Sequence, residues 1–160
     1  MDRTLIPREE ELVVIREEAM EFAGIGLYRL LLDGTVVFMN HQTLRVLDLQ
    51  DQYPDPTALA GRNVSELFEY LEEPGSFRAA VLKTGSVRNR EYHLRTLSGH
   101  LKWILHTSYL VTDTATGEQA IQAIAMDVTE QRVTRDALRR SEDKTRAILR
   151  AMPDLMFRLA

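Results

Sequence analysis

Hydrophobic residues near the start of the chain recur at the spacing of an α-helix. Pro7 suits a first helical turn, and three consecutive glutamates beginning at Glu9 favour the positive end of the helix dipole. The pattern therefore predicts an amphipathic connecting helix within residues 1–22. Four apolar residues, three or four positions apart, would share one face of this helix: Leu12, Ile15, Ala19 and Phe22.

The pattern then changes to that of a β-hairpin. Residues 27–32 and 35–39 are mostly apolar, and the pair Asp33-Gly34 between them is a strong two-residue turn signal. Asn40 follows the second strand and can cap a helix over residues 41–49. The inward-facing residues of that helix would be Leu44 and Leu47.

Two helical segments are predicted next. Ser65 can cap a short turn over residues 66–68, and a longer helix is expected over residues 73–84, closed by Gly85. After this point the pattern is that of strands, over residues 87–97, 101–112 and 120–128. In the middle strand of these three, alternation places four residues on one face: Trp103, Leu105, Thr107 and Tyr109.

The period changes once more after residue 128, where the chain becomes highly charged and helical. A seam of alternating four- and three-residue spacing runs along this helix, and it is polar in its middle. We expect a linker helix over residues 130–151. The seam consists of Thr134, Leu138, Ser141, Thr145, Ile148 and Met152.

These elements together predict an α+β domain. Two groups of strands with helices between them suggest one five-stranded antiparallel sheet, with the helices on one face and further helices at both ends of the domain.

Composition narrows the class of protein. With 44% hydrophobic and 28% charged residues the chain can form a globular core, and its net charge of -4 argues against a nucleic-acid-binding domain. The absence of cysteine excludes disulfides, thiolate metal sites and cysteine nucleophiles. No run of apolar residues is long enough for membrane insertion, and the first residues lack the apolar core of a signal peptide, so we expect a cytoplasmic protein.

The two flanking helices carry opposite charge. Residues 1–22 have a net charge of -4 and residues 129–150 a net charge of +3. Opposite fields of this kind favour pairing of the helices, either within one chain or across a homodimer, although two independently solvated helices remain an equal alternative.

Residues typical of catalysis are present without a catalytic arrangement. The chain contains neither a Gly-x-Ser-x-Gly elbow nor a Walker glycine loop, so no enzymatic activity is expected. The histidines also lack the spacing of a helical metal site. They are His41, His93, His100 and His106.

Several local motifs, in this order over about a hundred residues, resemble the PAS domain family of sensory modules. The most specific is Asp127-Val128-Thr129-Glu130-Gln131, which is similar to the Asp-Ile-Thr motif that ends many PAS domains. The supporting motifs are Asp33-Gly34 with Val37-Phe38-Met39-Asn40, Gly61-Arg62-Asn63 with Leu67-Phe68, and Leu97-Ser98-Gly99-His100 before Lys102-Trp103. The resemblance covers residues 23–129 and implies a strand order of 2-1-5-4-3. Gln42 and Ser98 depart from the family pattern.

The resemblance also implies a small-molecule pocket between helices and sheet. Haem is not expected because the helix over residues 73–84 contains no histidine, and a covalent flavin is not expected because Val64 stands where a cysteine would form the adduct. Noncovalent flavin stays open, and the same side chains could simply fill the core. The pocket candidates are Met39, Phe68, Phe77, Tyr92, Trp103, His106 and Met126.

For signalling, the resemblance implies a relay at the end of the last strand. Asp127 or Thr129 can cap the outgoing helix, and Glu130 favours its positive end. Residues 152–160 parallel the segment that begins at residue 23 and are similar to the start of a second PAS domain. The parent protein would then carry adjacent PAS and output domains, most often a histidine kinase and next a diguanylate cyclase. The alternative is a ligand-free PAS scaffold that only dimerises and spaces its neighbours.

Overall fold

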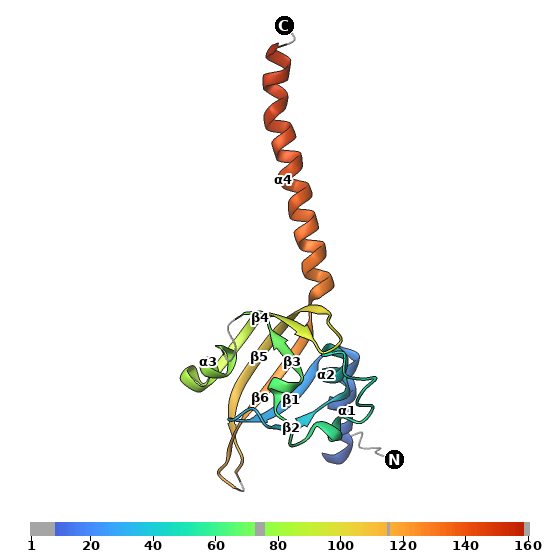
Figure 1. Cartoon of the computed structure of the whole chain (residues 1–160), viewed down its shortest axis with the longest axis vertical. Coiled ribbons are helices and arrows are strands. Elements are labelled where there is room, and N and C mark those ends of the chain that lie inside the picture. The colour runs from blue at the N-terminus through green and yellow to red at the C-terminus, as the bar shows by residue number, and fades with distance from the viewer. Residues whose placement is uncertain (1–8, 73–75, 115, 159–160) are drawn as a thin grey trace, which may run out of the picture. The chain divides into compact units, whose positions relative to one another are not determined.

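The computed structural model describes residues 9–72, 76–114 and 116–158, which form two compact units, Met1–Asp127 and Val128–Ala160. Figure 1 shows the elements. In chain order they are α1 (Glu9–Phe22), β1 (Gly26–Leu31), β2 (Val36–Met39), α2 (His41–Val46), the 3-10 helices η1 (Pro56–Leu59) and η2 (Val64–Glu66), β3 (Phe68–Tyr70), α3 (Ser76–Thr84), β4 (Ser86–Thr96), β5 (Leu101–Thr112), β6 (Gln119–Asp127) and α4 (Thr129–Arg158).

The first unit is built on one antiparallel sheet of six strands in the order β2-β1-β6-β5-β4-β3. The prediction of five strands was therefore wrong by one. The five expected strands are all present. When β3 is left out, the order of the other five strands is the order that the resemblance implied.

The additional strand, β3, replaces the helical turn expected over residues 66–68. It pairs with the outer edge of β4, where Phe68 lies opposite Thr96 and Tyr70 opposite Leu94. Aromatic residues at alternate positions favour a strand, and pairing with β4 gives the backbone hydrogen bonds that a single helical turn would lack. The turn is limited to η2, which ends at Glu66.

The core lies between one face of the sheet and the short helices. Leu44 of α2 and Leu47, the residue that follows this helix, are buried there as predicted, together with Leu30 of β1 and Ile104 of β5. A second cluster joins Phe77 and other residues of α3 to the sheet. Helices thus pack against one face of the sheet (Figure 1).

Both ends of the short helix α2 are held by specific contacts. As predicted, Asn40 caps its start: the side-chain oxygen accepts hydrogen bonds from the Thr43 amide at 3.0 Å and from the Leu27 amide at 2.9 Å. The helix ends at Val46 and not at residue 49, because Asp48 adopts the left-handed conformation with φ of 57°.

The apolar face expected along α1 is not buried within this chain. Ile15 is 52% exposed and Phe22 is 97% exposed, while Leu12 is half-buried. The sheet packs its core against α2 and α3, so α1 has few apolar neighbours in its own chain. Pro7 lies outside the described residues.

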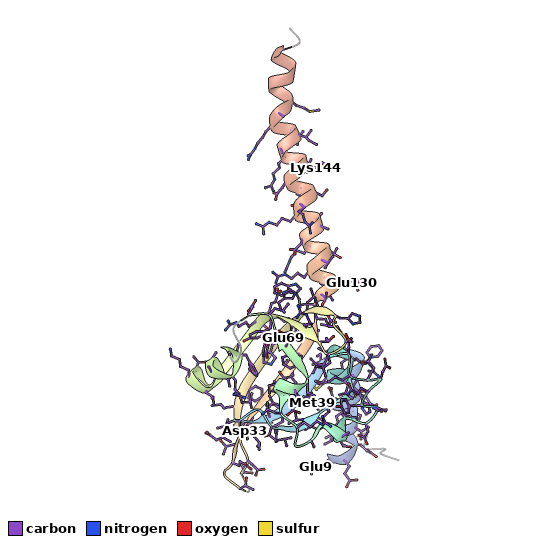
Figure 2. The ribbon with its side chains drawn as sticks, in the orientation of Figure 1. Glu9, Asp33, Met39, Glu69, Glu130 and Lys144 are labelled. Carbon is purple, nitrogen blue, oxygen red and sulfur yellow. The ribbon has the colours of Figure 1, made fainter. Side chains whose placement is uncertain are left out.

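The second unit is a single helix, α4, that starts at Thr129 as expected. Its apolar residues, such as Leu138 and Ile148, are exposed, and Figure 2 shows side chains standing out from the helix, Lys144 among them. Residues 152–158 continue α4 and do not form the opening strand of a second domain, because an isolated strand has no hydrogen-bonding partner whereas a helix pairs its own backbone. Residues 159 and 160 lie outside the described part of the chain. No helix among the described residues has the length and apolar character needed to cross a bilayer.

Candidate functional site

A narrow cavity lies between the sheet and the short helices. Its volume is about 30 Å³, and its wall is almost entirely apolar. Four of the seven pocket candidates line it, namely Met39, Phe68, Tyr92 and His106. Met39 is labelled in Figure 2, within the first unit.

The polar centre of this cavity is a pair of side chains from two different strands. The hydroxyl of Tyr28 and Nε2 of His106 are hydrogen-bonded, and His106 is only 3% exposed. Burial lowers the pKa of His106 to about 3, because the imidazolium ion would lose its hydration, and it also raises the pKa of Tyr28. The pair is therefore neutral at physiological pH.

His106 retains one unused hydrogen-bonding atom. Its Nδ1 is buried and has no hydrogen-bond partner among the described residues. Whichever tautomer the ring adopts against Tyr28, Nδ1 is then an unsatisfied donor or acceptor. A buried polar atom of this kind is costly without a partner.

A larger cleft adjoins the cavity. It has a volume of about 470 Å³ and lies between β3 and the start of α3. Phe77 lines this cleft, and its ring meets the ring of His106 edge-on with 4.4 Å between centroids. Phe68 and Tyr70 line both spaces. Phe77, the fifth pocket candidate on this face of the sheet, thus lies between the cleft and His106.

Trp103 and Met126 lie elsewhere. Residues on β5 alternate between faces, so Trp103 cannot point to the same side as His106. Trp103 stacks on His93 with ring centroids 4.2 Å apart, and Met126 pairs with Leu105 on that same outer face. The structure therefore does not bring these two candidates into the cavity.

The relay residue Asp127 is connected to α2 through Lys102. The side chain of Lys102 is 13% exposed, and its Nζ donates to the carbonyls of Val46 at 2.9 Å and Arg45 at 3.3 Å. The same Nζ lies 3.3 Å from Oδ2 of Asp127. The last carbonyls of a helix lack partners within it, and a lysine is a favourable one. One ammonium group thus contacts both α2 and the end of β6.

The other two relay residues lie at the start of α4. Thr129 is its first residue, and the first backbone bond of the helix runs from the Arg132 amide to the Val128 carbonyl at 2.9 Å. Glu130 is an acid in the first turn, which suits the positive end of the helix dipole. Val128 is therefore the residue directly before the helix, between Asp127 and Thr129.

Metal ligands do not gather anywhere in the described part of the chain, where no group of three histidine, aspartate or glutamate side chains is close enough to hold an ion.

Three residues of the site were missed from the sequence. Tyr28 could have been found, since it alternates with buried Leu30 on β1. Asp48 and Lys102 are 54 positions apart and only the fold brings them together.

The chain matches a model of the PAS domain over residues 24–130. In structure it resembles the PAS domain of an HTR-like protein from Haloarcula marismortui, with a TM-score of 0.53 and 19% identity, covering 74% of this chain and 93% of that chain. It also resembles a PAS domain from a two-component sensor histidine kinase, with a TM-score of 0.57 and 10% identity, covering 75% and 99%.

A third similar structure is the PAS domain of nitrogen regulation protein NR(II) from Vibrio parahaemolyticus, with a TM-score of 0.57 and 9% identity over 71% of this chain and 97% of that one. At these identities the likeness shows the fold. No curated protein sequence matches the chain.

Proposed function

Since the chain belongs to the PAS domain family, we propose that it is the sensory and dimerisation module of a multidomain signalling protein. The observation that carries the proposal is the neutral Tyr28–His106 pair beside the cavity, with Nδ1 of His106 left unsatisfied. A module that only filled its core with apolar side chains would not need a buried polar pair there.

The size of the cavity supports a small ligand. A volume of about 30 Å³ has room for one or two water molecules, so a larger ligand must also use the adjoining cleft or displace side chains. We propose neither haem nor a covalent flavin as the ligand, a choice supported by the small volume and by Val64 in the wall, at the position where the resemblance would place a reactive cysteine. The ligand class that fits is a small uncharged molecule with one hydrogen-bonding group, because the neutral imidazole offers no charge to pair with an ion.

The signal in this proposal leaves through the junction of β6 and α4. A ligand or partner that displaces the cavity wall changes the position of Asp127, and the helix after Val128 changes its pitch or register. The polar residues Ser141 and Thr145 in the seam of α4 suit a helix pair with two accessible registers. The homodimer would form through α1 and α4, which carry opposite charge.

The proposal also concerns the output domain of the parent protein. Two of the similar structures come from proteins whose names describe a sensor histidine kinase and a nitrogen regulation protein, which supports a histidine kinase as the output. A diguanylate cyclase is the second choice. We further propose a cytoplasmic location, a second PAS domain that follows α4 in the parent protein, and no catalysis by this module itself.

Native mass spectrometry of the purified chain, combined with an absorbance spectrum, tests the sensor. We expect a bound small molecule at stoichiometric level that is lost in H106F, in which phenylalanine keeps an aromatic ring at this position and removes both nitrogens. H93F, on the outer face of the same sheet, is the matched control and should keep the ligand. An apo dimer under all conditions would instead favour the ligand-free scaffold, and absorbance at 400–450 nm would indicate haem or flavin.

A further inference from the structure

Asp48 stands at a position whose backbone favours glycine. Its φ of 57° is left-handed, and the Leu49 and Asp48 amides bond back to the carbonyls of Leu44 at 2.7 Å and Arg45 at 3.2 Å. This pairing is the Schellman motif, in which glycine is usual because a Cβ is disfavoured there. An aspartate at this position costs backbone strain, so its side chain must contribute something in return.

The carboxylate of Asp48 is the centre of a polar cluster. Oδ1 accepts a hydrogen bond from Lys102 Nζ at 2.7 Å, and Oδ2 lies 2.6 Å from His100 Nδ1. The hydroxyls of Thr96 and Ser98 donate to Oδ2 at 3.1 and 3.2 Å. Burial would raise the pKa of Asp48, but the hydrogen bonds from Lys102 and His100 hold it at about 2. The group is therefore a permanent anion that fixes Lys102 in place.

Lys102 connects this cluster to two functional parts of the domain. On one side it holds the end of α2, where Val46 and Leu47 line the inner cavity. On the other side it contacts Asp127, the last residue of β6. Since the ammonium is mostly buried, a shift of α2 must either carry Lys102 along or leave its charge short of partners.

We propose that Asp48 and Lys102 are positioning residues that couple the end of α2 to Asp127, so that a displacement of the cavity wall is transmitted to the end of the sheet. The physiological meaning of this coupling rests on the proposed sensory function. The coupling itself is a property of the described first unit and requires neither a ligand nor an output domain.

Carboxyl-carbon NMR of the full chain tests the coupling directly. We expect D48N, which keeps a residue tolerant of positive φ, to shift the carboxyl signal of Asp127, and D127N to shift that of Asp48, because coupling is reciprocal. K102M keeps the aliphatic stem without the charge, and in that background D48N should no longer move the Asp127 signal. K102R, which keeps the charge, should restore part of the effect. E69Q breaks the exposed Glu69–Arg95 pair on the neighbouring strands and is the control that leaves Asp127 unchanged.

Urea unfolding of a double-mutant cycle gives an independent measure. The combined effect of D48N and D127N on the unfolding constant should depart from the product of the single effects by about threefold or more, whereas D48N and E69Q should multiply independently. This cycle needs no Lys102 variant, so it decides the question even if K102M does not fold. Independent effects in the first cycle, or an Asp127 signal that ignores D48N, would overturn the coupling. Neither the NMR measurement nor the unfolding cycle uses a ligand, so a failure to find one would not affect their results.

Discussion

Tyr28 on β1 and His106 on β5 are hydrogen-bonded across the strand that separates them. Between the two lies β6, where Ala123 pairs with Tyr28 and Ala125 pairs with His106. Because both alanines end at Cβ, the two rings can meet above the middle strand. Small residues at these two positions are therefore what allows a polar pair to form in the centre of an otherwise apolar wall.

The first prediction concerns the Tyr28 hydroxyl. Y28F should lower the free energy of unfolding by about 1–3 kcal/mol, because it leaves both nitrogens of a buried imidazole without a protein partner. Urea unfolding at pH 7.5 measures the loss. Y109F removes a hydroxyl from a tyrosine on β5 that is 47% exposed, and it should change the free energy very little. Equal effects of the two variants would argue against the importance of the buried pair.

The second prediction is a pH dependence. Burial lowers the pKa of His106 from 6.5 to about 3, so the unfolded chain binds a proton in this interval that the folded chain does not. Stability should therefore fall as the pH falls below about 6.5, with a contribution from this residue of about 1.4 kcal/mol per pH unit.

Unfolding curves between pH 7.5 and 5 measure this slope. The variant H106Q should reduce it by the contribution of one proton, and H93Q, on the outer face of the sheet, should keep the slope of the original chain. A slope that is the same in all three proteins would be inconsistent with a neutral buried His106.

The third prediction concerns the stability that Asp48 confers at acidic pH. The pKa of Asp48 is about 2 in the fold against an ordinary value of 3.8, since hydrogen bonds from Lys102 and His100 outweigh the effect of burial. The stability that the carboxylate confers should be complete above pH 4 and be lost as the pH falls toward 2. The difference in unfolding free energy between the original chain and D48N should narrow over that range. For D51N, which alters an exposed aspartate, we expect a small difference that does not follow this course.

The fourth prediction tests the proposed homodimer. Replacing Ile15 and Phe22 together by glutamate should give a monomer, because the interface would lose two apolar side chains and would have to bury two carboxylates in their place. Sedimentation or light scattering measures the mass. L82E changes a leucine on α3 that is nearly as exposed as Ile15, and it should leave the mass unchanged. A dimer that survives the double variant would place its interface away from α1.

Local patterns were sufficient for most of the fold. The Asn40 cap and the five expected strands each depend on residues close in sequence and are present, and the hairpin turns at Asp33-Gly34 as predicted, although Leu32 joins these two residues in a three-residue loop between Leu31 and Thr35. Strand β3 was missed because three residues carry little pattern of their own, and the free edge of β4 decided their conformation.

The site was less predictable than the fold. His106 and Trp103 are three positions apart on one strand, so their side chains point to opposite faces of the sheet and cannot line the same cavity. This alternation along β5 could have been applied to the sequence. No local pattern predicts that Lys102 would meet Asp48, since the contact depends on how the β4–β5 hairpin lies against the end of α2. Long-range polar contacts of this kind follow only from the assembled fold.

The sheet ends at Asp127 and α4 begins at Thr129, which leaves one residue as the joint. A single residue has two soft backbone torsions, so φ and ψ of Val128 set the direction in which α4 leaves the sheet. The helix of 30 residues that follows is a lever arm about 45 Å long. A rotation of about 10° at Val128 would therefore move the far end of the helix by about 8 Å, which is nearly as large as the spacing between packed helices.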